Sequence, residues 1–167
     1  MLQKKLCMLG SFAVGKTSLV RRYVDSIFSE NYVTTIGVKI DKKVMSVDDT
    51  DLSLVLWDVY GEDNHQSVLP SYLRGMAAYI LVIDPSRPAT FESAKNLHAL
   101  VLDTLGPKPF VLVLNKSDIK DKWEYNDNIL KELSAAAIDT IETSAKTDTG
   151  VDDVFLSLGR ALVQSAR

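Results

Sequence analysis

Short runs of apolar residues recur along this chain, separated by amphipathic stretches and polar turns. Unbroken apolar runs of this kind are typical of strands that other elements cover on both faces. They predict strands at 4–9, 77–83, 110–114 and 138–143. A hairpin is predicted from 37–47 and 52–57, because these two strand-like stretches flank an acidic turn at 48–51.

Apolar residues recur at helical spacing between these strands, which predicts helices beginning near Lys16, Thr90, Asn126 and Gly150. A further short helix is expected within 62–75. The Thr90 hydroxyl is expected to cap its helix, and Gly106 to end it. Strands that alternate with helices predict βαβ units and a doubly wound sheet. We therefore expect an α/β fold in three layers, with a six-stranded, mostly parallel sheet, one antiparallel edge strand and about five flanking helices.

The composition is that of an ordinary globular protein, and residues 1–167 are expected to form a single domain. Hydrophobic residues make up 46% and charged residues 25% of the chain, and no repeat or linker interrupts it. The net charge of −3 disfavours a nucleic-acid binder, which usually needs a basic surface. The one cysteine, Cys7, lies in an apolar strand, which excludes an intramolecular disulfide and predicts a small buried side chain.

No stretch of the sequence suggests a membrane anchor. No apolar run approaches the roughly 18 residues that indicate a membrane-spanning helix. The second residue is not the glycine that myristoylation requires, and the sequence carries no C-terminal cysteine for prenylation. We expect a cytoplasmic protein, with peripheral membrane association only if a C-terminal tail is missing from this sequence.

Residues 10–17 have the spacing Gly-x-x-x-x-Gly-Lys-Thr between a predicted strand and a predicted helix. This pattern is typical of a phosphate-binding loop. Its glycines leave room for backbone N–H groups to face anionic oxygens, and the following helix adds its own unpaired N–H groups. Lys16 would supply positive charge to the β- and γ-phosphates, and the Thr17 hydroxyl would supply an oxygen ligand for Mg²⁺.

Asp58 and Gly61 follow the second strand of the predicted hairpin. Asp58 is placed to hold Mg²⁺ directly or through water, although a carboxylate at the end of a strand is also a common turn former. Gly61 favours the first interpretation, because a glycine N–H can approach a γ-phosphate closely.

Two further polar motifs follow predicted strands, at 115–118 and 144–146. The Asp118 carboxylate can accept two parallel N–H bonds from guanine, a pair of donors that adenine does not offer. Asn115 can brace the neighbouring loops, and the apolar stem of Lys116 can lie against the base. A backbone N–H near Ala145 can reach the guanine O6. All these motifs lie at the carboxyl ends of strands, where parallel sheets bind ligands.

Together these motifs resemble those of the small GTPases of the Ras superfamily, and of the Rab branch most closely. The similarity covers essentially all 167 residues, including 10–17, 32–38, 57–58 with 61, 71–75, 115–118 and 142–146. It implies a P-loop G domain that binds GTP or GDP with Mg²⁺. The expected nucleotide-binding residues are Ser11, Phe12, Ala13, Val14, Gly15, Lys16, Thr17, Ser18, Phe28, Thr35, Gly61, Asn115, Lys116, Asp118, Ser144, Ala145 and Lys146. The expected Mg²⁺ ligands are Thr17, Thr35 and Asp58, and the expected catalytic residues are Lys16, Thr35, Gly61 and Glu62.

The resemblance further implies that Phe28 packs against guanine and that Thr35 ligates Mg²⁺ only in the triphosphate state. Segments near 29–39 and 60–75 would then be two switches, released together when the γ-phosphate is lost. Through these segments the protein would bind an exchange factor, a GTPase-activating protein and effector proteins.

The second switch departs from the family pattern, with Val-Tyr-Gly-Glu-Asp at 59–63 in place of the usual Thr-Ala-Gly-Gln-Glu. The usual glutamine amide both donates to and accepts from the attacking water. An ionised Glu62 only accepts, and it brings negative charge toward the γ-phosphate. Tyr60 and Phe12 add bulk nearby. We therefore expect slow unaided hydrolysis, or else a Glu62 that points to solvent while a partner supplies the catalytic group. Ile40 also differs from the phenylalanine usual in Rab proteins.

Two functional hypotheses follow from these differences. The first is a regulatory GTPase that switches between GTP and GDP states. The second is a GTP-dependent interaction module with little or no hydrolysis, which Glu62, Tyr60 and Phe12 favour. A kinase that shares the phosphate loop is disfavoured, because the sequence shows no arginine-rich lid.

The two histidines and a pair of arginines are given structural roles. His65 and His98 have no partners at metal-ligand spacing, so we expect surface or packing roles for both. Arg21 and Arg22 are expected on a solvated face of the first helix.

Overall fold

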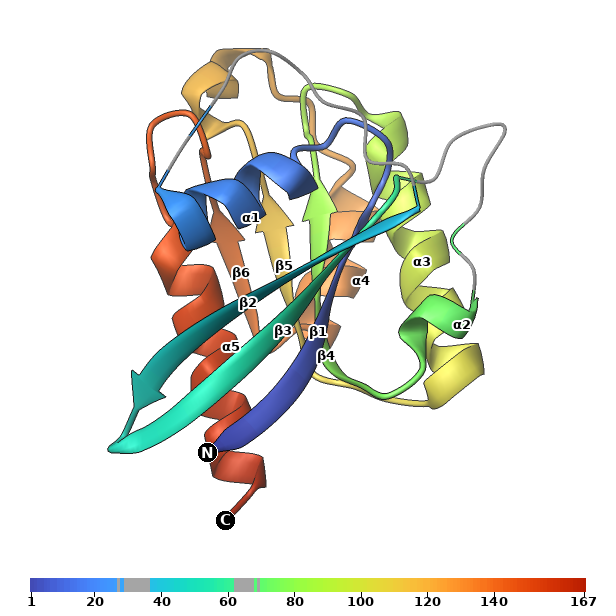
Figure 1. The fold of residues 1–167 in the computed structure, drawn as a ribbon. Helices are drawn as coiled ribbons and strands as arrows, with labels where there is room; N and C mark the ends of the chain where they lie inside the picture. The colour runs from blue at the N-terminus through green and yellow to red at the C-terminus, as the bar shows by residue number, and fades with distance from the viewer. Residues whose placement is uncertain (27, 29–36, 62–67, 69) are drawn as a thin grey trace.

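A six-stranded sheet forms the centre of the molecule (Figure 1). The computed structural model describes residues 1–26, 28, 37–61, 68 and 70–167. The strands are β1 (Leu2–Gly10), β2 (Val38–Val47), β3 (Thr50–Val59), β4 (Met76–Ile83), β5 (Phe110–Leu114) and β6 (Asp139–Glu142). Their order is β2-β3-β1-β4-β5-β6, and every neighbouring pair is parallel except β2 and β3. The predicted sheet, with one antiparallel edge strand, is confirmed.

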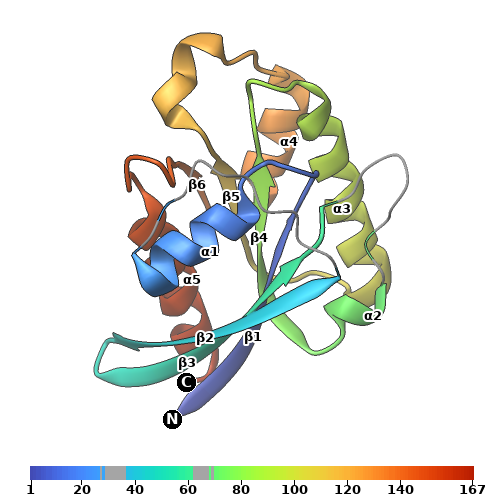
Figure 2. The ribbon, with the colours of Figure 1, turned by 45° about the horizontal axis from the view of Figure 1, so that its top comes forward.

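Helices cover both faces of this sheet, which gives the three expected layers (Figure 2). The helices are α1 (Lys16–Asp25), α2 (Pro70–Leu73), α3 (Ala89–Leu105), α4 (Asp127–Ala136) and α5 (Val151–Ser165), with a 3-10 segment η1 (Ser117–Lys122). α1 and α5 pack on one face, where the rings of Tyr23 and Phe155 stack with centroids 3.7 Å apart. α2, α3 and α4 cover the other face.

Successive residues of β1 divide between the two cores, as the pleat of a strand requires. Leu6 and Met8 join the core under α1 and α5, whereas Cys7 and Leu9 join the core under α3 and α4. All four side chains are almost completely buried. This double burial explains the unbroken apolar run in the sequence, and it confirms the prediction for Cys7.

The β2–β3 hairpin closes more tightly than the sequence suggested. Asp48 and Asp49 both have positive φ, at 49° and 62°, and β3 already begins at Thr50. Two central residues with positive φ are the mark of a type I′ turn, whose twist matches that of the strands it joins. Only two of the four predicted turn residues therefore form the connection.

Thr90 does not cap α3, so that prediction is wrong. The helix begins at Ala89, after Pro88, and no side chain caps it. The buried Thr90 hydroxyl instead accepts from the backbone N–H of Asp84 at 3.1 Å, and it lies 2.8 Å from the carbonyl oxygens of Asp84 and Arg87. Thr90 thus holds the turn between β4 and α3.

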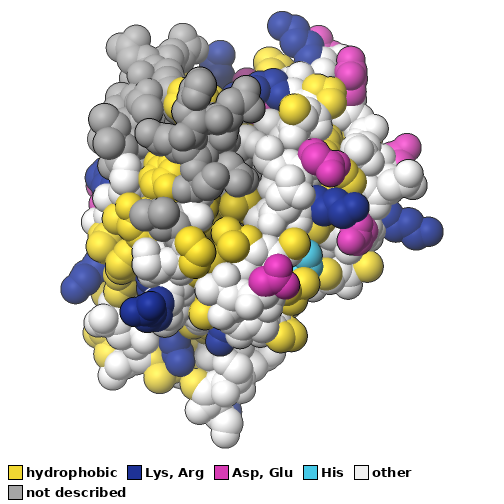
Figure 3. All heavy atoms as spheres, turned by 90° about the vertical axis from the view of Figure 1, so that its right-hand side faces the viewer, with side chains coloured by type: hydrophobic (Ala, Val, Ile, Leu, Met, Phe, Trp, Pro, Cys, Tyr) yellow, Lys and Arg dark blue, Asp and Glu magenta, His cyan; other side chains and the backbone are white. Residues whose placement is uncertain are grey.

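Among the described residues on the face in Figure 3, basic and acidic side chains are interspersed and form no broad basic patch. No described helix combines the length and apolar character needed to cross a membrane.

Candidate nucleotide-binding site

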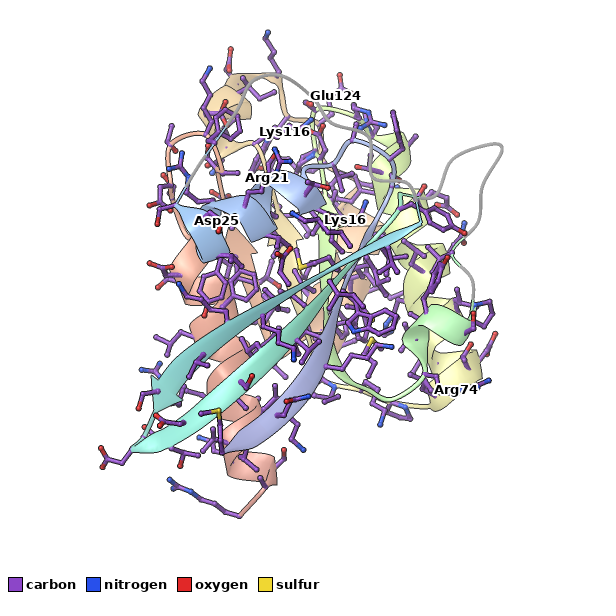
Figure 4. All side chains as sticks on the ribbon, in the orientation of Figure 1. Lys16, Arg21, Asp25, Arg74, Lys116 and Glu124 are labelled. Atoms are coloured by element: carbon purple, nitrogen blue, oxygen red, sulfur yellow. The ribbon has the colours of Figure 1, made fainter. Side chains whose placement is uncertain are left out.

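The predicted motifs meet at one rim of the sheet, beyond the carboxyl ends of β1, β3, β5 and β6. Figure 4 shows Lys16 and Lys116 at this rim, although they belong to loops 100 residues apart in sequence. Side chains from the loop after β5 hydrogen-bond to the loop after β1. The fold therefore brings together the segments on which the sequence predictions rest.

The glycines of the loop after β1 stand where a side chain would clash. A Cβ on Gly15 would lie 2.2 Å from Nδ2 of Asn115, and φ at Gly15 is 106°. A Cβ on Gly10 would lie 2.6 Å from the carbonyl oxygen of Val82. Both glycines thus let this loop pack closely against its neighbours.

Lys16 reaches back over the loop that precedes it. Its ammonium donates to the carbonyl oxygens of Gly10 and Ser11, each at 3.0 Å, and the residue is only 6% exposed. Burial lowers the pKa of Lys16 to about 8, against the opposing effect of the Asp58 charge, and the charge of Arg87 lowers the pKa further. The ammonium is therefore held in a fixed position, where an anion could bind to it and favour its charged form.

Thr17 and Asp58 form an oxygen pair across the site. The Thr17 hydroxyl donates to Oδ2 of Asp58 at 2.7 Å, and Asp58 is 1% exposed. A hydroxyl beside a buried carboxylate is the type of donor set that Mg²⁺ takes, with waters and phosphate oxygens completing its shell. No group of three or more His, Cys, Asp or Glu among the described residues could hold a metal ion alone. Thr17 and Asp58 fit a Mg²⁺ ion that phosphate oxygens would also ligate.

Gly61 lies directly against the loop after β1. A Cβ at this position would lie 2.3 Å from Cα and 2.4 Å from N of Phe12, so only glycine fits. The preceding Tyr60 is 9% exposed and packs edge-on against Tyr72, with ring centroids 5.9 Å apart. Its bulk is accommodated in the core under α2 and α3.

Asn115 and Lys116 connect the two halves of the site. Asn115 is buried; its Nδ2 donates to the carbonyl of Val14 at 2.9 Å, and its Oδ1 accepts from the Thr143 hydroxyl at 2.9 Å. This is the bracing that was predicted. The Lys116 ammonium donates to the carbonyl of Ala13 at 2.9 Å and pairs with Oδ2 of the buried Asp84 at 2.9 Å.

Asp118 and the loop after β6 are joined by a side-chain hydrogen bond. The Ser144 hydroxyl donates to Oδ1 of Asp118 at 2.8 Å and accepts from the backbone N–H of Thr147 at 3.1 Å. Ser144 and Ala145 are buried. The carboxylate predicted to select guanine is thus fixed beside the loop whose N–H was predicted to reach O6.

The prediction that Arg22 lies on a solvated face holds only in part, because the residue is half-buried and bonds to the loop after β6. Its Nε donates to the carbonyl of Ala145 at 2.8 Å, and its Nη2 donates to the carbonyl of Lys146 at 3.0 Å. The guanidinium carbon lies 6.0 Å from the ring centroid of Phe28. No motif marks Arg22, because its role depends on a loop more than 120 residues away.

Sequence reasoning also missed three residues that bond to the loops of the site, namely Asp84, Thr143 and Arg87. For His98 a packing role is confirmed, because its Nδ1 lies 2.7 Å from the Tyr79 hydroxyl. Thr35, Glu62 and His65 lie outside the described residues, as do parts of the two expected switch segments.

Comparison with known proteins places this chain in a family. The family model of the Ras family matches residues 5–164, so the chain belongs to the Ras family. Ras-related protein RABG3b of Arabidopsis thaliana is 35% identical over 98% of this chain and 85% of its own length. Ras-related protein Rab7 of Glycine max is 35% identical over 94% of this chain and 81% of its own. GTP-binding protein YPT1 of Saccharomyces cerevisiae is 32% identical over 96% of this chain and 79% of its own. Within the family, the chain is a Rab-like small GTPase.

Proposed function

We propose that residues 1–167 form a G domain that binds GTP and GDP with Mg²⁺ and hydrolyses GTP slowly when no partner is present. The observation that carries this proposal is the contact of Asn115 and Lys116 with the phosphate loop. Because of these contacts, a base bound beside Asp118 would have its phosphates within the loop at 10–17. The relatives named GTP-binding or Rab agree with this assignment.

The phosphates would be held by Lys16 and by the backbone N–H groups of the loop. Thr17 and Asp58 would hold Mg²⁺, together with Thr35, and bound Mg²⁺ supplies charge neutralisation of the phosphate oxygens. Asp118 and the loop at 144–146 would bind guanine. The Gly61 N–H would then contact the γ-phosphate from the other side.

In the proposed reaction, a water oxygen attacks the γ-phosphorus, the bond to the β–γ bridging oxygen breaks, and GDP and phosphate leave. The water would need a group that orients it. Glu62 in its ionised form can only accept a hydrogen bond, and it adds negative charge beside an anion. This residue is the reason for expecting slow hydrolysis.

A second candidate function rests on the same observation about Glu62. The chain would act as a GTP-dependent interaction module, which binds partners through 29–39 and 60–75 while scarcely turning over. The neighbouring surface of β2 and β3 offers an exposed Ile40 paired in register with Trp57. An exchange factor, a GTPase-activating protein and effectors are the expected partners of the first function.

Nucleotide extracted from the purified protein tests the shared part of the proposal. Guanine nucleotide with Mg²⁺ is expected, and a protein that prefers adenine nucleotides would contradict both functions. Single-turnover hydrolysis of radiolabelled GTP then separates them, since a rate like that of ordinary family members would exclude the second. Glu62→Gln should raise the rate if the charge is the obstacle, with Glu92→Gln, on the exposed side of α3, as the matched control.

A further inference from the structure

Three consecutive carbonyl groups of the phosphate loop accept hydrogen bonds from side chains that belong to other loops. Asn115 donates to Val14, Lys116 donates to Ala13, and Nη1 of Arg87 donates to Phe12 at 2.8 Å. The first two donors belong to the motif that the sequence predicted. Arg87 belongs to no motif, and it comes from the turn between β4 and α3.

The orientation of these carbonyls decides where the loop's N–H groups point. Peptide bonds are planar, and the described residues contain no cis peptide, so each N–H points opposite to the carbonyl of its own peptide unit. A side chain that holds the Phe12 carbonyl therefore turns the Ala13 N–H away from that side chain. Three such contacts in succession turn the N–H groups of Ala13, Val14 and Gly15 away from those side chains, as an anion-binding nest requires. The Val14 N–H also donates within the loop, to the Ser11 carbonyl at 3.4 Å.

The backbone that carries Arg87 is itself fixed. The Arg87 N–H donates to the carbonyl of Asp84 at 2.9 Å, which closes a turn with Pro85 in its second position. Oδ1 of Asp84 accepts from the N–H of Ser86 at 3.0 Å and from its hydroxyl at 2.6 Å. Oδ2 of the same buried carboxylate pairs with Lys116. The Asp84 carboxylate thus fixes both the turn that carries Arg87 and the Lys116 side chain that bonds to Ala13.

We propose that Arg87 is a positioning residue for the phosphate loop, which it holds from the outside so that the loop is ready for the β-phosphate before nucleotide binds. The inference rests on the proposed guanine-nucleotide site and assigns to it a residue outside the predicted motifs. Arg87 acts through Phe12 and does not need to touch the nucleotide. Its side chain is otherwise exposed, so its removal should leave the core intact.

The test compares GDP with GMP, measured by competition against a fluorescent GDP at fixed Mg²⁺ and ionic strength. GMP carries one phosphate, next to the ribose, and lacks the group that would enter the loop. Arg87→Ala should weaken GDP binding by roughly tenfold, as expected for the loss of one hydrogen bond from a charged donor, and should leave GMP binding within twofold of wild type. Arg87→Lys should recover most of the loss, because an ammonium can also donate to the Phe12 carbonyl.

Two controls separate this role from a general effect. Arg160→Ala removes the same charge from an exposed position on α5 and should change neither affinity. Arg87→Gln keeps a donor without the charge and should fall between Ala and Lys.

A loss of GDP affinity in Arg87→Ala that GMP does not share, with recovery in Arg87→Lys, supports the proposal. Equal losses for both nucleotides, or no loss for either, overturn it while the proposed function stands. A wild-type protein that binds no guanine nucleotide overturns the proposed function, and the assignment of Arg87 falls with it.

Discussion

The phosphate side and the base side of the candidate site hold their groups in different ways. On the phosphate side, defined by 10–17 and Gly61, the expected donors are backbone N–H groups, and side chains from other loops fix them by bonding to the carbonyls. On the base side, defined by 116–118 and 144–146, the expected reader is the Asp118 side chain, which Ser144 holds. One side relies on backbone geometry and the other on side-chain chemistry.

We therefore expect the two sides to tolerate substitution differently. A backbone site depends on residues that leave room for neighbouring atoms. At Gly15 and Gly61 any side chain would clash, because an added Cβ would lie too close to a neighbouring residue. A side-chain site depends on one carboxylate and on the hydrogen bonds that fix it. Asn115 belongs to both, because its amide joins Val14 on the phosphate side to Thr143 next to the base side.

Replacement of Asn115 should weaken the phosphate side and the base side together, and we expect it to cause the largest loss of nucleotide affinity. Asn115→Ala leaves the Val14 carbonyl and the buried Thr143 hydroxyl without this partner. We expect this loss to weaken the free energy of nucleotide binding by about 3 kcal/mol. We expect GDP and GMP affinity both to fall by roughly 100-fold, measured by competition binding. Asn128→Ala, at an exposed position of α4, is the control and should leave both affinities unchanged. A loss confined to GDP would show that Asn115 serves the phosphate side alone.

A methyl group at Gly61 should affect the phosphate side only. In Gly61→Ala the new Cβ would overlap the backbone of Phe12. Overpacking of this kind lowers the free energy of unfolding by about 1–3 kcal/mol unless the loop moves. We expect single-turnover GTP hydrolysis to fall at least tenfold, with GMP affinity unchanged.

The matched control for Gly61 is Gly106→Ala, where nothing lies within 4 Å of the new Cβ but φ is +76°. That change should lower the free energy of unfolding by about 1 kcal/mol without altering hydrolysis. Wild-type hydrolysis in Gly61→Ala would mean that the loop moves away from Phe12 when GTP binds.

Much of this arrangement could be predicted from the sequence because it is local. The apolar runs predicted the strands, and the glycine spacing predicted the loop after β1. The contacts of Arg22 and Arg87 could not be predicted, because each joins residues 75 or more positions apart with no spacing to mark it. Arg22 lies on an amphipathic helix, where a polar face normally meets water, but here that face meets the loop at 144–146. Thr90 precedes an apolar helical face, as a capping residue does, but its hydroxyl bonds to the backbone of Asp84 instead.

Arg22 offers the counterpart of Arg87 on the base side. Arg22→Ala removes two hydrogen bonds to the carbonyls of Ala145 and Lys146 and the contact with Phe28, so the loop expected to bind guanine loses its support. We expect GDP and GMP affinity to fall together by roughly tenfold, so that their ratio stays constant. Arg160→Ala again controls for charge. A change in the GDP to GMP ratio would show that Arg22 also acts on the phosphate loop.

The smallest effect is expected on the labelling rate of the Cys7 thiol. Because Cys7 lies in the sheet, this rate shows whether a substitution in the loops also disturbs the core. Burial raises the pKa of the Cys7 thiol to about 12, against the opposing effect of Lys5, and its side chain is fully buried. At pH 8 only about one thiol in ten thousand would be ionised, so iodoacetamide should label the folded protein far more slowly than the unfolded chain. Arg87→Ala and Arg22→Ala should leave this slow rate within twofold of wild type, because their effects are confined to loops. Asn115→Ala should accelerate labelling, since it loosens loops that follow two core strands. Fast labelling in either arginine variant would mean that the two sides of the site are coupled through the core and are not separately held.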